Sequence, residues 1–167
     1  MGLPWLVQKG AVMATRYAIV LAAAAMALLS ASPALAGAGR QPAAGSGALG
    51  PDLVTSVRTA GGNTIVVGTS TGALGGTFQA DFTESFRDVI HADGSVNIAG
   101  TVSLEGQTPC GTGSWTQRLV VHVAPDGSFS GQTAAINAAA ATIPLRTQYS
   151  FRGAASTFAY AGSYSCA

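Results

Sequence analysis

The chain has 167 residues with a formal net charge of +1, and only 9% of its residues are charged. Six arginines, no lysine and all seven acidic residues follow residue 36. This composition excludes the basic patch that nucleic-acid binding requires, and it disfavours attraction to an anionic membrane surface.

The first predicted element is an N-terminal export signal. Residues 13–16 are a short basic start, residues 17–29 are mostly apolar, and residues 30–36 are small and end in Ala-Leu-Ala. This order is typical of a secretory signal peptide, so we expect one over 1–36, helical and cleaved after Ala36, with Met13 as an alternative start. A transmembrane anchor is the alternative, but a bilayer span needs roughly 20 apolar residues. We therefore expect a secreted protein with no membrane attachment after cleavage.

Residues 37–51 follow as a Gly-, Ala- and Pro-rich segment. It has neither hydrophobic periodicity nor apolar bulk, so the sequence predicts a disordered linker. A single β domain is expected over 52–167.

Short β-type runs then alternate with turn signals. The predicted strands cover 53–58, 64–69, 77–91, 95–104, 114–123, 128–136, 145–152 and 157–165. The sequences Asp93-Gly94 and Pro125-Asp126-Gly127 predict tight hairpin turns, because glycine supplies positive φ and proline fixes φ. Residues 134–142 are Ala-rich and are expected to form a loop with one helical turn.

Apolar and polar residues alternate strictly in the third run, which predicts a sheet with one solvent-exposed face. Apolar Phe78, Phe82 and Phe86 share a phase with Ala80 and Glu84, and polar residues occupy the other phase. This pattern is typical of antiparallel sheets. About eight such runs joined as hairpins favour a small closed antiparallel barrel, with a two-sheet sandwich as the alternative. The third run is long, which predicts a bulge near Arg87 and Asp88.

Two cysteines, Cys110 and Cys166, are predicted to form one disulfide in an oxidising compartment. Counting strand directions along the hairpins places both at the same end of the barrel. No further ligand lies near Cys166, so no metal site is expected there, and we expect no cofactor.

Glu84 is the main candidate for chemistry, because its phase places a carboxyl among phenylalanines. It could anchor a ligand or act as a general acid or base, with Arg118 or Arg152 as its cation. The alternative is that a bulge turns Glu84 towards water.

The remaining candidates are histidines and aromatic residues. His91 and His122 precede two turns and could assist acid–base chemistry or be ordinary polar strand ends. Trp115, Tyr149 and Phe151 are inward by phase, so they fill a core or line an apolar pocket. The predicted ligand-binding set is Phe78, Phe82, Glu84, Phe86, Trp115, Tyr149 and Phe151, and the catalytic candidates are Glu84, His91 and Arg118.

The stretch Gly68-Thr-Ser-Thr-Gly72-Ala-Leu-Gly75-Gly76-Thr-Phe78 and the hairpin at 89–95 resemble small bacterial secreted proteins of unassigned function. Those proteins are similar in layout to allene-oxide-cyclase-like and calycin-like barrels. The resemblance covers about residues 64–106 and implies a barrel without implying any catalytic residue. The C-terminal part departs from it, since it lacks a Gly- and Leu-rich closing hairpin.

Three functions stay open on this sequence. The first is a secreted, non-enzymatic barrel that binds a small apolar ligand or a partner protein. The second is a cyclase-, isomerase- or hydrolase-type enzyme that uses Glu84 and an arginine. The third is a structural, envelope-associated protein. An internal cavity of roughly 300 Å³ or more around Glu84 would favour the first two.

Overall fold

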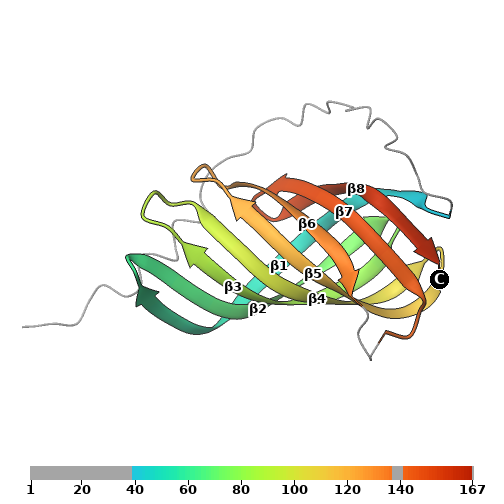
Figure 1. Cartoon of the computed structure of the whole chain (residues 1–167), viewed down its shortest axis with the longest axis horizontal. Helices are drawn as coiled ribbons and strands as arrows, with labels where there is room; N and C mark the ends of the chain where they lie inside the picture. The colour runs from blue at the N-terminus through green and yellow to red at the C-terminus, as the bar shows by residue number, and fades with distance from the viewer. Residues whose placement is uncertain (1–38, 137–140, 167) are drawn as a thin grey trace, which may run out of the picture. The chain divides into compact units, whose positions relative to one another are not determined.

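The computed structural model describes residues 39–136 and 141–166, which form one closed antiparallel barrel (Figure 1). Each strand pairs with the next in sequence, and the last pairs with the first. The strands are β1 (Gln41–Ala60), β2 (Asn63–Gly76), β3 (Gln79–Ile90), β4 (Val96–Thr108), β5 (Gly111–Val123), β6 (Ser128–Ile136), β7 (Leu145–Ala154) and β8 (Thr157–Cys166). The predicted eight-stranded barrel is confirmed, and the sandwich alternative is wrong.

The predicted signal peptide over 1–36 lies outside the described residues. Within the described part, no helix has the length and apolar character that a membrane span requires. Residues 134–136, predicted to begin a loop, instead end β6, and residues 137–140 lie outside the described part.

The linker predicted over 37–51 is wrong from residue 41 onward, because this segment is the first half of β1. Residues 41–48 pair with β8 and close the barrel. This segment has few large apolar side chains of its own. The neighbouring strand β8 provides them, since Tyr160 and Phe158 lie directly across from Gly45 and Gly47. A strand can therefore be built from small residues when its cross-strand neighbours cover it.

The bulge predicted in the third strand is also wrong. β3 keeps an unbroken register against both β2 and β4. The register shifts lie in β1, between Leu49 and Asp52 and between Val54 and Ser56. Pro51 sits within the first shift, where a residue without an N–H donor interrupts the ladder least.

Aromatic side chains in the barrel interior lie across from glycines on neighbouring strands. The directly opposed pairs are Phe82–Gly72, Phe86–Gly68, Phe129–Gly153, Phe151–Gly131, Phe158–Gly47 and Tyr160–Gly45. A side chain at each of these glycines would collide with the opposing ring; at Gly68 its Cβ would lie 2.8 Å from Cζ of Phe86. The rings therefore lie along the barrel wall, above the glycines.

One end of the barrel, which we call the disulfide end, is filled by an aromatic cluster around Phe78. This residue sits in the β2–β3 turn, has no exposed surface, and stacks on Tyr160 at a ring-centroid distance of 5.9 Å. Trp115, Tyr149 and Tyr164 surround it at centroid distances of 6.0–6.1 Å. The Tyr160 hydroxyl accepts from the Phe78 amide and donates to the Gly75 carbonyl, so the turn is fastened to the wall.

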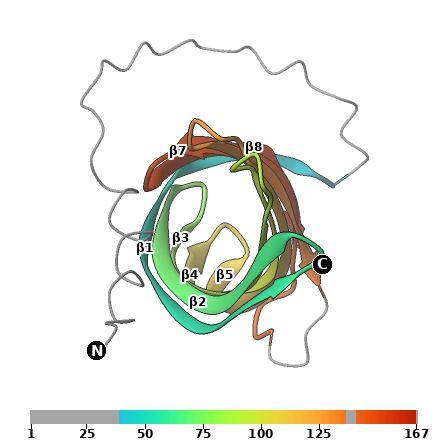
Figure 2. The same ribbon diagram turned by 90° about the vertical axis from the view of Figure 1, so that its left-hand side faces the viewer.

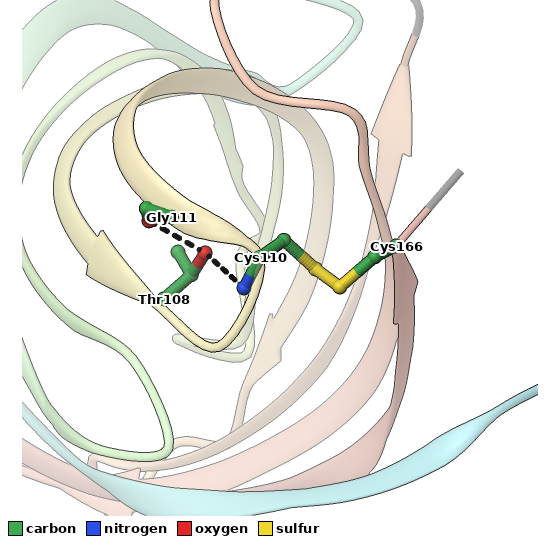
Figure 3. The surroundings of a disulfide bond; sticks show 4 residues. All are labelled: Thr108, Cys110, Gly111 and Cys166. Atoms are coloured by element: carbon green, nitrogen blue, oxygen red, sulfur yellow. Dashed lines mark hydrogen bonds between the residues drawn. A yellow bond between two sulfur atoms is a disulfide. The ribbon is translucent and has the colours of Figure 1, made fainter.

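The Cys110–Cys166 disulfide forms at this same end, which confirms the prediction from strand directions (Figure 3). Cys110 lies in the β4–β5 turn, Cys166 ends β8, and their Cα atoms are 5.4 Å apart. The Thr108 hydroxyl accepts from the Cys110 amide and donates to the Gly111 carbonyl, which orders the turn. The bond thus ties the C-terminal strand to a hairpin elsewhere in the barrel.

Removing the disulfide should weaken the fold without changing it. In the chain-entropy description, a loop of this separation contributes about 4 kcal/mol to the free energy of unfolding. We expect the double variant C110S/C166S to lose about that amount in urea unfolding while its far-UV circular dichroism stays unchanged. Equal unfolding midpoints for the variant and the wild-type protein would contradict this role.

Phe78 should be the costliest single truncation in the core. Phe78→Ala empties a fully buried site, and such changes cost about 3–5 kcal/mol. Phe78→Leu keeps most of the volume and should cost about half as much or less, as measured by chemical denaturation. A smaller loss for the alanine variant than for the leucine variant would show that Phe78 does not fill this end.

Candidate functional site

The predicted ligand-binding set lines the inside of the barrel. All seven residues are buried and face inward, from β3, β5, β7 and the β2–β3 turn; they are Phe78, Phe82, Glu84, Phe86, Trp115, Tyr149 and Phe151. We call the interior of the barrel, towards which these side chains point, the lumen; Figure 2 shows the ring of strands around it. The alternation in the sequence identified these residues because an antiparallel ladder sends every second side chain to one face.

Glu84 lies inside the lumen, and the alternative in which it turns towards water is wrong. Its side chain is 8% exposed, and its Oε2 accepts a hydrogen bond from Ser70 on β2 at 3.3 Å. Asp88, four residues further along the same face of β3, is equally buried. The missing bulge explains this outcome, since an unbroken register keeps Glu84 in phase with Phe82 and Phe86.

Burial raises the pKa of Glu84 to about 7. The hydrogen bond from Ser70 opposes this shift, and the negative charges of Asp88 and Asp52 add to it. The carboxyl is thus protonated in a large fraction of molecules near neutral pH, when it can donate a hydrogen bond as well as accept one.

The structure does not bring the three catalytic candidates together. Arg118 is exposed on the outer wall of β5, and Arg152 is exposed on the outer wall of β7, so neither partners Glu84. His91 lies beyond the end of β3, where its Nδ1 contacts Asn63 and its Nε2 contacts Asn97. The predicted pairing failed because arginine on these strands occupies the outward phase, where its charge stays hydrated.

A buried polar network that the sequence analysis missed joins the inner faces of β5 and β7. Gln117 has no exposed surface; its Nε2 donates to the Thr147 hydroxyl at 2.7 Å, and its Oε1 accepts from the Tyr149 hydroxyl at 2.6 Å. Burial raises the pKa of Tyr149 to about 12, so this hydroxyl remains a donor. The sequence contained one signal for this network, because Gln117 lies in the inward phase between Trp115 and Leu119.

Inner side chains are buried along the whole barrel. Phe78 and Gln117 have no exposed surface and Trp115 has 2%, and Phe86, Asp88 and Phe151 keep 7–9%. The aromatic cluster around Phe78 fills the disulfide end.

Two hollows of the described residues lie on the outer wall. One, of about 650 Å³, spans β1 to β5 and is lined mainly by outward residues, among them Ala73, Asp81, Thr83 and Glu105. The other, of about 590 Å³, lies over β5 to β7 and includes His122, Ser130 and Arg152. In residues 39–136 and 141–166, no group of three or more His, Cys, Asp or Glu side chains is placed to hold a metal ion.

Comparison with known proteins adds no family. Neither the protein-family models nor the curated proteins that were compared contain a match to this sequence.

Glu84 should make the stability of the fold depend on pH. Its folded pKa of about 7 lies above the ordinary value of 4.5 for a glutamate, so the native state holds the proton more tightly than the unfolded state. This contribution is complete below about pH 4.5 and is lost as the pH rises to about 7. At pH 8, Glu84→Gln should therefore be more stable than the wild-type protein by about 3 kcal/mol, and at pH 4 equally stable.

Urea unfolding of both proteins from pH 4 to pH 8 measures this difference. Asp81→Asn, on the outer face of the same strand, is the matched control and should show no comparable pH-dependent gain. A constant difference between Glu84→Gln and the wild-type protein at all pH values would show that the carboxyl does not titrate in the lumen.

Proposed function

We propose that this protein is a secreted, non-enzymatic barrel that binds a small, mainly apolar ligand in the lumen, with Glu84 as its polar anchor. The observation that carries the proposal is the wall of aromatic rings lying over glycines. Rings that lie over glycines present apolar surface to whatever occupies the interior, which suits a ligand site with few polar groups.

The position of Glu84 supports this proposal. Its carboxyl lies on the inner face of β3 between Phe82 and Phe86, and Asp88 follows on the same face. A carboxyl with a pKa of about 7 can donate to or accept from a ligand near neutral pH, at little electrostatic cost. The disulfide fits the oxidising environment that secretion implies.

A structural role is the second candidate, and the filled disulfide end favours it. Neither outer hollow is lined by Glu84. The two hollows therefore favour neither the ligand-binding role nor the structural role. An enzyme built on Glu84, Arg118 and His91 finds no support in the geometry, since the barrel wall separates Arg118 from Glu84.

Adjacent valines on β5 provide a matched test. Val121 faces the lumen and is 7% exposed, whereas Val120 faces outward and is 62% exposed. We expect N-phenyl-1-naphthylamine, a neutral apolar probe, to bind the wild-type protein with a saturable rise in fluorescence. Val121→Phe should weaken binding at least tenfold by filling the lumen, and Val120→Phe should leave it within twofold.

Thermal melts of both variants show whether each remains folded. If the two variants bind the probe equally, the probe does not occupy the lumen. If the wild-type protein does not bind it up to the solubility limit of the probe, the structural role gains support.

A further inference from the structure

The hollow over β5 to β7 contains two potential cations and a hydroxyl in one row. His122 lies directly opposite Ser130, and Ser130 lies directly opposite Arg152. The three side chains are exposed and face the same outer side, and the hollow beside them is lined by Phe129 and Gly153. Because adjacent strands are about 4.8 Å apart, side chains from β5 and β7 can converge on a group above β6.

Arg152 and Ser130 are available for a ligand. Among the described residues, no side chain forms a hydrogen bond or an ion pair with either of them. The nearest acid in sequence, Asp126 in the β5–β6 turn, uses its Oδ1 to accept from the amide and hydroxyl of Ser128.

His122 is held in one orientation. The Nδ2 amide group of Asn97 donates to Nε2 of His91. The Oδ1 atom of Asn97 lies 3.0 Å from Nδ1 of His122. Because an amide oxygen only accepts, Nδ1 of His122 carries the proton. Its Nε2 is then the atom left for other partners. A second proton at Nε2 makes His122 a cation that can donate to an anion while it keeps its bond to Asn97.

Arginines outnumber acids in the part of the chain that forms the surrounding wall. From residue 111 to the C-terminus the chain has three arginines, Arg118, Arg146 and Arg152, and a single acid, Asp126. All three arginines are exposed. A nearly neutral chain thus concentrates positive charge on one side of its barrel, which attracts anions to the hollow.

We propose that this hollow binds a tetrahedral oxyanion, the sulfate or phosphate group of an ester, with Arg152, Ser130 and protonated His122 as its donors. Arginine presents a planar fork of N–H groups suited to such oxygens, and the serine hydroxyl and the imidazolium add donors from the adjacent strands. The organic part of the ester lies against the outer backbone of Phe129 and Gly153. This site is separate from the lumen, because it is on the outer face of the wall.

Titration of the ¹⁵N-labelled protein with sodium sulfate tests the site, with sodium chloride of equal ionic strength as the reference. We expect saturable NMR shifts at Ser130, Gly153 and His122. Arg152→Gln should weaken sulfate binding at least tenfold. Arg87→Gln, which removes an exposed arginine from the outer face of β3, should leave it within twofold.

A substitution at His122 tests its part in the site separately. His122→Gln should weaken sulfate binding, because it removes the imidazole that faces Ser130 from β5. The groups around His122 are Asn97 with His91 behind it on the β4 side, Ser130 and Arg152 on β6 and β7, and Asp126 in the turn.

Methyl sulfate and methyl phosphate then distinguish the two sources of the group. Binding of either ester supports the site and identifies its chemistry, and binding of neither contradicts it. Equal weakening by Arg152→Gln and Arg87→Gln would show general charge attraction and overturn the proposal.

Discussion

The pairing of aromatic rings with glycines across neighbouring strands is the constraint on which the interior depends. An eight-stranded barrel has an interior that side chains fill or that holds one small ligand. Phe82, Phe86 and Phe151 fit because Gly72, Gly68 and Gly131 leave room for each ring to lie along the wall. The Gly-rich composition is therefore a packing requirement, and it explains why strands with little apolar bulk form a continuous sheet.

The lumen changes its chemistry along the barrel. The disulfide end is filled by aromatic side chains around Phe78 and held by hydrogen bonds of Tyr160 and Gln117. Further along, Glu84 and Asp88 occupy the inner face of β3, while Arg87 and Arg118 are exposed on the outer side. Burial without a neighbouring cation keeps the pKa of Glu84 high, and this couples the protonation of the lumen to the stability of the fold.

Several features were predictable because local rules determine them. Hairpin turns at Asp93-Gly94 and Asp126-Gly127 follow from turn chemistry, and in both the aspartate accepts from a serine two residues later. The inward phase of Glu84 follows from alternation along β3.

The first half of β1 was missed because its apolar cover, Phe158 and Tyr160, lies more than 100 residues away in sequence. The partner of Glu84 was mispredicted because sequence alone does not rank Ser70 above an arginine.

The sequence by itself determined the succession of strands, the inner and outer phase of most side chains, and the end of the barrel at which the two cysteines meet. These follow from period-two alternation and turn residues, which act over a few positions. Only the tertiary structure decided that residues 41–48 close the barrel, that rings lie over glycines, and that His122, Ser130 and Arg152 form one row. Those features depend on cross-strand register, which brings together residues far apart in sequence and leaves no local signal.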